Sequence, residues 1–484
     1  MIQSMLSREV LLHFLFVTGV GFLSYYVLIN TIYMLIHMAA MFRLRKVMKR
    51  PDIETIYSTL TSPFLPGVAI LVPAYNESAV IEDTVRSLLD LNYPNKEIVV
   101  INDGSDDDTL QRLQDEFQLT RTKASLPFET NSEPIKDVFM CDNYPELLVV
   151  DKENGGKSDA LNAGLWLTEQ PLFGAIDADS LIDPDGLSKV LRPFVEHPEQ
   201  TVAAGGSVHV ANGCDIENGR VKNIKLPDNT LGEIQVMEYL RAFYSGRLGL
   251  AEIGSLVLIS GAFGVFRTDL VREIGGYDTE SITEDFDLVV RLHRHLTEID
   301  RDYRIDFVPD PVVWTEVPED IPTLSRQRRR WFRGMVDTLE THRDIIGSRK
   351  YGRAGLIGLP MKFFGEAMGR LMEGMGYVLL PIALLAGAIS VKFLLVYFFL
   401  TVSIGTFLSW FGIFSEVWGF RRYEDPRQIV RLLGAGVLEN LGYRQWRTLV
   451  AWRGLWEYFR GVNSWGTMAR SSFGRTPIDP REDV

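Results

Sequence analysis

The sequence has little cysteine and no excess of positive charge. Among 484 residues, only Cys141 and Cys214 are cysteines, and they lie far apart in the chain. Two such residues form neither a disulfide scaffold nor a cysteine-ligated zinc cluster, and free thiols suit a reducing cytoplasm. The formal net charge is −13, whereas a general nucleic-acid binder carries a basic surface. We therefore expect no nucleic acid among the partners.

Charge is also missing from a long stretch near the N-terminus. No Asp, Glu, Lys or Arg lies between Glu9 and Arg43, and about 20 apolar residues are enough to cross a bilayer. We expect a membrane span within residues 10–42. A cleaved signal peptide is the alternative, but its apolar core would have only about 7–15 residues. A basic cluster typical of a cytoplasmic anchor follows: Arg43, Arg45, Lys46, Lys49 and Arg50.

A second region nearly free of charge lies close to the C-terminus. Between Glu373 and Glu416 the only charged residue is Lys392. This length divides naturally into two membrane spans, which we expect at residues 374–391 and 393–415. Two spans return the chain to the side of the membrane from which it entered.

Basic residues border both apolar regions, which sets the expected orientation through the positive-inside rule. Residues 43–353 are then cytoplasmic and the N-terminus lies outside, as in an integral protein of the cytoplasmic (inner) membrane. Residues 354–373 and 428–443 mix apolar with charged side chains. They are expected to form amphipathic interfacial helices, with partial insertion or a third span as the alternatives. The bordering residues near the second region are Arg343, Arg349, Lys350, Arg353, Arg421, Arg422, Arg427 and Arg431.

The middle of the chain alternates between strand-like and helix-like patterns. This alternation predicts an α/β fold with a mainly parallel sheet covered on both faces. Polar residues at 121–143 and 212–232 predict loops. Strands are expected at residues 68–72, 97–101, 147–150, 172–176, 202–210, 256–259 and 265–266. Helices are expected at residues 78–91, 109–117, 157–167, 186–194, 284–296 and 323–341.

Acidic residues follow two of the predicted strands, where parallel sheets bind their ligands. Asp177 and Asp179 flank one alanine and can approach one divalent cation such as Mg²⁺, which prefers oxygen ligands shared with substrate phosphates. Asp177 could instead hold a ribose or a metal-bound water, and the whole turn could be a solvated loop or a helix cap. Asp103 could accept a hydrogen bond from a base N–H, or could close an Asx turn.

Two charged positions stand at the start of predicted helices. Lys157 follows two glycines, so the helix N-terminus and the ammonium group both favour a phosphate; an exposed lysine at a turn is the alternative. Glu284 and Asp285 follow Thr283. These residues could simply cap the helix, or Asp285 could take the proton of an attacking hydroxyl.

A third helix carries the sequence Gln-Arg-Arg-Arg-Trp at residues 327–331. Gln327, Arg330 and Trp331 can share one broad face of the helix. Arginine pairs bidentately with phosphate, and the indole ring can stack on a sugar. The alternative is a basic helix at the membrane surface with Trp331 as an interfacial anchor.

In this order, six motifs resemble those of the membrane-bound processive family 2 glycosyltransferases, which include cellulose, chitin, hyaluronan and poly-N-acetylglucosamine synthases. The resemblance covers about residues 67–335 by motif and the terminal spans by layout. It implies a GT-A catalytic domain and an inverting mechanism. The motifs are Val72-Pro-Ala-Tyr-Asn-Glu77, Asp103-Gly104, Gly156-Lys157, Asp177-Ala-Asp179, Thr283-Glu-Asp285 and Gln327-x-x-Arg330-Trp331.

The resemblance also implies a role for each motif residue. The uridine is held by Tyr75, Glu77 and Asp103. The diphosphate is contacted by Lys157, Gln327 and Arg330, and Glu284 belongs to the same substrate-binding set. Asp177 serves the nucleotide, Asp179 the metal (Mg²⁺ or Mn²⁺), Asp285 is the general base and Trp331 lies at the acceptor.

The C-terminal segment contains Ser464-Trp465-Gly466-Thr467, which is similar to a gating segment of the chitin and hyaluronan synthases. In that segment an arginine follows directly, whereas here it is displaced to Arg470. Through its resemblance to the gating segment, Trp465 is a further candidate for substrate binding.

These features divide the chain into four expected parts. They are an N-terminal span with a basic segment (1–50), a cytoplasmic GT-A domain (51–345), interfacial and transmembrane helices (346–447) and a cytoplasmic C-terminal segment (448–484).

The expected function is inverting transfer of a hexose or N-acetylhexosamine from a UDP-sugar to a growing polysaccharide at the cytoplasmic membrane face, with export. The bilayer is a partner, and a homo-oligomer or an export protein is a candidate to complete the polymer path. Transfer of one sugar to a lipid carrier and a catalytically silent sugar-binding export subunit are the alternatives. The identity of the sugar is left open.

Overall fold

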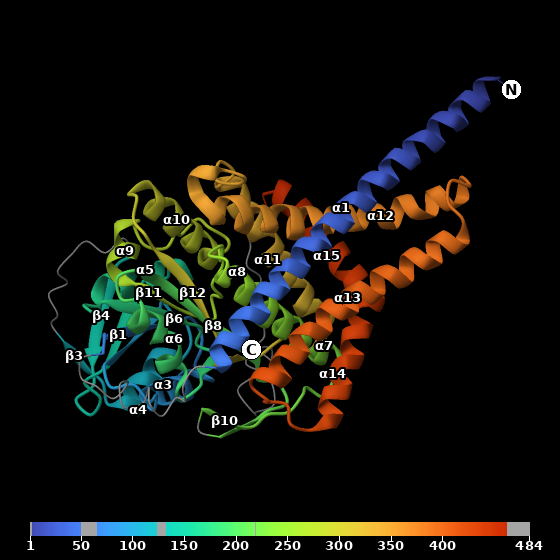
Figure 1. Ribbon diagram of the computed structural model, residues 1–484. Coiled ribbons are helices and arrows are strands. Elements are labelled where there is room, and N and C mark those ends of the chain that lie inside the picture. Colours follow the sequence, from blue (N-terminus) through green and yellow to red (C-terminus); the bar gives the residue numbers. More distant parts are fainter. Residues whose placement is uncertain (1, 50–64, 123–131, 218, 462–484) are drawn as a thin grey trace.

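A computed structural model describes residues 2–49, 65–122, 132–217 and 219–461 of the chain (Figure 1). Within these residues a ten-stranded sheet has the order β3-β4-β5-β2-β1-β6-β11-β8-β12-β7. Its strands are β1 (Val68–Ala74), β2 (Lys96–Asp103), β3 (Thr120–Thr122), β4 (Ile135–Met140), β5 (Leu147–Lys152), β6 (Leu172–Ile176), β7 (Ser180–Ile182), β8 (Thr201–Val210), β11 (Phe263–Arg267) and β12 (Arg304–Thr315).

The centre of the sheet is parallel, as predicted. Strands β5, β2, β1 and β6 run side by side in one direction, and β8 and β12 form a further parallel pair. Only β4, β7 and β11 run against the other strands of this sheet. The central strands are short apolar runs buried on both faces, which is what helices on both sides of a sheet require.

Helices cover both faces of the sheet and begin close to where the sequence pattern predicts them. In Figure 1, α5 and α9 lie above the sheet and α3 and α4 below it. The helices around the sheet are α3 (Ile81–Leu89), α4 (Thr109–Phe117), α5 (Lys157–Leu167), α6 (Gly186–Glu196), α9 (Thr268–Glu273), α10 (Glu284–Glu298) and α11 (Ile321–Thr341).

Three of the predicted segments were wrong. Residues 256–259 form no strand; Leu256, Val257 and Ile259 are buried, but the segment pairs with no other strand. The expected loop at 121–143 contains β4, and the expected loop at 212–232 contains the hairpin of β9 (Asp215–Glu217) and β10 (Arg220–Asn223). Polar residues can pair as strands at a solvated sheet edge, so composition alone misassigned these two segments.

Three helices are long and apolar enough to cross a membrane: one over Leu12–Met48, one over Ala354–Leu385 and one over Val391–Gly419. The first belongs to α1 (Ile2–Met48), the second ends in α12 (Met368–Leu385) and the third is α13 (Val391–Gly419). These helices indicate association with a membrane. The expected break at Lys392 was wrong, since the turn lies between α12 and α13, before Lys392.

Further helices join the apolar helices to the sheet, and Figure 1 shows them gathered beside α1, α12 and α13. Helix α13 packs on α7, and α15 packs along α11 and α12. The joining helices are α7 (Thr230–Arg241), η1 (Ala242–Arg247), α8 (Leu248–Glu252), η2 (Arg349–Tyr351), η3 (Ala354–Gly358), η4 (Met361–Ala367), α14 (Pro426–Leu438), η5 (Glu439–Tyr443) and α15 (Arg444–Phe459).

The contact between α13 and α7 depends on Gly412. A Cβ atom at this position would lie 2.7 Å from the backbone N of Arg241. We expect Gly412→Ala to lower stability by about 1–3 kcal/mol through overpacking, measured as thermal unfolding in detergent. Gly434 in α14 is the matched control, since a Cβ there meets nothing within 4 Å. Gly434→Ala should be neutral or stabilising because alanine favours helix; equal behaviour of both variants would contradict the close contact.

Candidate active site

One cavity of about 4070 Å³ begins at the carboxyl ends of the central strands and continues between α1, α12 and α13. Strand register brings these ends to one edge, because Ala74 of β1 is level with Asn102 of β2, which is level with Asp151 of β5. Trp465 lies outside the described residues. All other predicted site residues line this cavity: Tyr75, Glu77, Asp103, Lys157, Asp177, Asp179, Glu284, Asp285, Gln327, Arg330 and Trp331.

The turn after β1 is fixed against the turn after β2. Tyr75 donates its hydroxyl hydrogen to Asp106 at 3.2 Å, and the Asp106 backbone N–H donates to the Asn76 side chain at 2.9 Å. The backbone N–H of Glu77 donates to the Thr109 hydroxyl at 2.9 Å. Tyr75 is exposed and Glu77 is buried, so one wall of the cavity offers an aromatic ring beside a sheltered carboxylate.

Asp103 is held by the loop that precedes α5. Its Oδ1 accepts hydrogen bonds from Lys152 Nζ at 2.8 Å and from the Gly155 N–H at 3.0 Å, while Oδ2 accepts from the Gly156 N–H at 2.8 Å. Gly104 allows this approach with a φ of 65°, because a Cβ there would lie 2.8 Å from the Asn154 backbone N. Asp103 therefore positions the glycine loop in addition to facing the cavity.

Lys152 is a buried cation that sequence reasoning missed. Its side chain has no exposed surface, and it pairs with both Asp103 and Asp159. A buried charge is stable only when it is paired. Asp151 separates Lys152 from the apolar run at 147–150, so the local pattern gave no signal that this lysine is buried.

Lys157 joins two of the predicted motifs. Its Nζ lies 2.6 Å from Asp177 Oδ1 and 3.0 Å from Glu284 Oε1. Burial lowers the pKa of Lys157, but the two carboxylates outweigh burial and hold this pKa above its usual value. The lysine is thus part of an ion triad that ties α5 to the end of β6 and the start of α10, so the alternative of a merely exposed lysine is wrong.

The acidic pair after β6 concentrates negative charge. Burial and the charges of Asp177 and Glu316 raise the pKa of Asp179 to about 7. Among the described residues no three His, Cys, Asp or Glu side chains lie close enough to hold a metal by themselves. Two carboxylates suffice for Mg²⁺ when substrate phosphates supply further oxygens, so the donor set fits a divalent cation that arrives with a nucleotide.

Asp285 stands at the first turn of α10 with both oxygens hydrogen-bonded. Oδ2 accepts from the Gly261 N–H at 2.8 Å, and Oδ1 accepts from the Phe286 N–H at 2.8 Å. Burial and the neighbouring Glu284 raise the pKa of Asp285, whereas Lys157 opposes the rise. This environment leaves a carboxylate able to accept a proton at the cavity wall.

Helix α11 presents Gln327, Arg330 and Trp331 to the cavity. Gln327 Oε1 is buried and accepts no hydrogen bond from the described residues. Arg328 and Arg329 lie between Gln327 and Arg330 in the sequence. Neither is available to bind a membrane surface, because Arg328 pairs with Glu238 and Arg329 pairs with Glu457. The alternative of a simple basic surface helix therefore does not account for α11.

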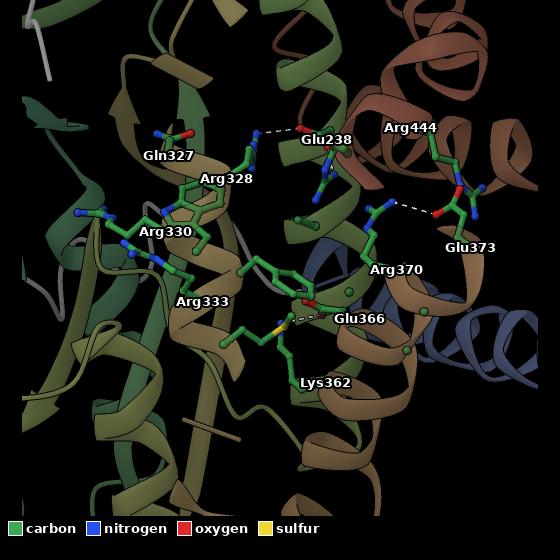
Figure 2. A pocket seen from close by; sticks show the side chains of 18 of the residues that line it. Glu238, Gln327, Arg328, Arg330, Arg333, Lys362, Glu366, Arg370, Glu373 and Arg444 are labelled. Atoms are coloured by element: carbon green, nitrogen blue, oxygen red, sulfur yellow. Dashed lines mark hydrogen bonds and ion pairs between the residues drawn. The ribbon is translucent and has the colours of Figure 1, made fainter. Parts of the chain in front are cut away.

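Where the cavity approaches the apolar helices, a cluster of charged side chains from α12 and α15 lines its wall. Figure 2 shows Arg370, Glu373 and Arg444 together at this part of the wall. Arg370 Nη1 lies 3.2 Å and Arg444 Nε 2.5 Å from the Glu373 carboxylate. This cluster was missed because α12 begins at Met368, before the expected span. Tyrosines of α1, α12 and α13 also line the cavity: Tyr25, Tyr26, Tyr33, Tyr377 and Tyr397.

The chain matches a family model described as glycosyltransferase like family 2 over residues 66–334. This match contains all the site motifs within the described residues and covers more than half of the chain.

Two curated relatives are poly-β-1,6-N-acetyl-D-glucosamine synthases. The chain is 29% identical to that of Staphylococcus epidermidis over 320 residues, which is 66% of each protein. It is 30% identical to that of Staphylococcus aureus strain COL over 332 residues, 69% of this chain and 67% of that protein.

Among solved structures, a mannosyltransferase from Pyrobaculum calidifontis, in complex with GDP-Man and Mn²⁺, aligns with a TM-score of 0.49 and 17% identity. The alignment covers 86% of this chain and 99% of the mannosyltransferase chain.

Lys152 gives a direct test of the described geometry. We expect Lys152→Met to lower stability by about 3–5 kcal/mol, because two buried carboxylates lose their cation. The measurement is thermal or denaturant unfolding of the purified chain in detergent. Lys225→Met is the control, since Lys225 forms an exposed pair with Asp215 and such pairs contribute about 0–1 kcal/mol. A similar small effect for both variants would argue against the buried pair.

Proposed function

Since this chain belongs to glycosyltransferase-like family 2, we propose that it transfers N-acetylglucosamine from UDP-N-acetylglucosamine to a growing polysaccharide at the cytoplasmic face of a membrane. The α/β GT-A fold and the assignment as a transferase of class EC 2.4 are confirmed. The sugar is proposed from the names of the staphylococcal relatives, of which the chain matches about two thirds.

The observation that carries this proposal is the single cavity. Its lining includes the predicted nucleotide-binding residues, the predicted base and acceptor residues, and residues of the apolar helices. A donor with two phosphates and a uracil needs a groove lined by cations, hydrogen-bonding groups and an aromatic ring. An acceptor polymer needs a second opening, and the cavity extends toward the apolar helices.

In the proposed reaction, Asp285 accepts the proton of an acceptor hydroxyl as that oxygen bonds to the anomeric carbon. The bond from this carbon to the diphosphate oxygen breaks, its electron pair leaves with UDP, and the anomeric configuration inverts. Gln327 and Arg330 bind the diphosphate, and Tyr75, Glu77 and Asp103 bind the uridine.

The charge of the leaving group sets the roles of the remaining residues. Lys157 holds Asp177 and Glu284 in place and adds positive charge near the diphosphate. A divalent cation held by Asp179, with Asp177 beside it, would stabilise the charge on the leaving diphosphate when bound. Burial alone would raise the pKa of Glu284, but Lys157 and, less strongly, the Arg330 guanidinium lower it, so Arg330 also acts at this end of the cavity.

We further propose that the polymer leaves through the cavity between the apolar helices. Tyrosine rings can stack on sugars, and their hydroxyls can bond to them, so a wall of tyrosines suits a neutral saccharide. Three helices only partly surround a path, so a second copy or an export partner would complete it. We propose the same four parts of the chain that the sequence predicts: an N-terminal span with a basic segment (1–50), a GT-A catalytic domain (51–345), interfacial and transmembrane helices (346–447) and a C-terminal segment (448–484). In this proposal the catalytic domain is cytoplasmic and the N-terminus lies outside.

The decisive experiment incubates the purified chain in detergent with Mg²⁺ or Mn²⁺ and a panel of radiolabelled UDP-sugars, and then sizes the product. We expect long polymer from UDP-N-acetylglucosamine. Asp285→Asn should lower transfer by about 10²–10⁴-fold, as expected for loss of a general base, while UDP binding stays within about twofold. A single sugar on a lipid would exclude the polymerase, and active Asp285→Asn would exclude the base.

The ion triad predicts a change in pH dependence. The charge of Lys157 opposes the rise in the pKa of Asp285, and transfer requires the deprotonated carboxylate. Lys157→Met should therefore move the acid limb of the kcat–pH profile to higher pH, and Lys157→Arg should restore it. Lys189→Met is a control, because Lys189 of α6 pairs with Asp183 and neither residue lines the cavity. An unmoved acid limb in Lys157→Met would contradict the electrostatic role.

A further inference from the structure

Three consecutive arginines of α11 have three different surroundings. Arg330 and Arg328 both line the cavity, as does Glu238, whereas Arg329 does not. Arg329 pairs with Glu457 of α15. Arg328 is buried, and its Nη2 lies 2.8 Å from Glu238 Oε2 on α7. Figure 2 shows a dashed line between these two side chains. The family resemblance gives a role to Arg330 only, which leaves the buried pair of Arg328 and Glu238 without one.

Glu238 is the centre of a buried network rather than one half of a simple pair. Its Oε2 also accepts a hydrogen bond from the Tyr443 hydroxyl at 2.9 Å, and its Oε1 pairs with Arg447. Burial raises the pKa of Glu238, but Arg447 and Arg328 outweigh burial and lower it to about 2. The carboxylate is therefore ionised at every working pH and forms a fixed anchor between α7, α11 and α15.

Arg328 connects this anchor to a residue of the cavity wall. Its Cζ lies 4.4 Å from the centroid of the Trp331 ring, which is a cation–π contact. A guanidinium held by a buried carboxylate cannot move freely, so the ring beneath it loses freedom as well. A ring with one face covered can offer a sugar only its other face and its edges.

We infer that Glu238 is a positioning residue for the acceptor: through Arg328 it fixes the orientation of Trp331. This inference rests on the proposed function, which places Trp331 at the acceptor site. Because the contact is at the acceptor end of the cavity, its loss should weaken binding of the polymer without weakening binding of the nucleotide. A merely structural ion pair would affect both ligands or neither.

The sequence offers a matched pair of conservative variants. Arg328→Lys keeps a positive charge for Glu238 but removes the planar group over Trp331. Arg329→Lys makes the same change one residue later, beside Glu457. Glu238→Gln removes the anchor itself, with Glu233→Gln as its control, because Glu233 lies on the same helix and pairs with Arg431.

The kinetic test uses the full chain in detergent, UDP-N-acetylglucosamine and a β-1,6-linked N-acetylglucosamine pentasaccharide. We expect Arg328→Lys and Glu238→Gln to raise KM for the pentasaccharide about fivefold to tenfold, in line with a cation–π contact. KM for the UDP-sugar and Kd for UDP should stay within about twofold. Arg329→Lys and Glu233→Gln should resemble the wild type. An unchanged pentasaccharide KM in Arg328→Lys, or an equal rise in Arg329→Lys, overturns the inference.

A spectroscopic readout separates this inference from the identity of the sugar. In protein labelled with 5-fluorotryptophan, the ¹⁹F resonance of Trp331 is assigned by its loss in Trp331→Phe. We expect that resonance to shift or broaden in Arg328→Lys and Glu238→Gln and to stay unchanged in the two controls. Wild-type protein that makes no product from UDP-N-acetylglucosamine refutes the proposed sugar; an unmoved Trp331 resonance in Arg328→Lys refutes the positioning role.

Discussion

The contact of Lys157 with Asp177 and Glu284 is the interaction on which the arrangement of the cavity depends. It joins the start of α5, the end of β6 and the start of α10, which are separated by long stretches of chain. Like charges in a sheltered site repel one another, and a buried carboxylate without a cation is costly. One ammonium group therefore allows acidic residues from two motifs to stand at one wall, where a nucleotide and its cation would meet them.

Local sequence patterns predicted some residues of the cavity, but they did not predict the charged partners of these residues. Asp103, Asp177 and Lys157 could be predicted because strand ends and helix starts have local signatures that place them at one edge of a parallel sheet. The buried charged residues Lys152 and Glu238 could not be predicted in this way. Lys152 is buried by the β2–β5 register, and Glu238 meets Arg328 only because α7 and α11 pack together. Contacts between distant segments are set by packing, which a local pattern does not contain.

For the apolar helices, too, the sequence pattern predicted one feature correctly and another wrongly. Their existence followed from the lack of charge, but the turn between α12 and α13 did not follow from Lys392, whose long chain tolerates a helical site near a membrane. The turn instead uses Gly387, with a φ of 71°, and Ser390, whose hydroxyl oxygen accepts a hydrogen bond from the Phe393 N–H. Glycine and a helix-capping serine were the better signals.

The charges along the cavity also separate the two ligands that the proposed reaction requires. At the sheet edge, Lys157 and Arg330 stand where an anionic diphosphate would bind, and near α12 the basic groups of Arg370 and Arg444 are balanced on Glu373. Between α1, α12 and α13 the lining is mostly apolar, with several tyrosines among the apolar side chains. A nucleoside diphosphate gains most by staying at the first end, whereas a neutral saccharide loses little by moving on. If the chain polymerises a neutral sugar as proposed, this change of lining would hold the nucleoside diphosphate at the sheet edge more strongly than it holds the saccharide.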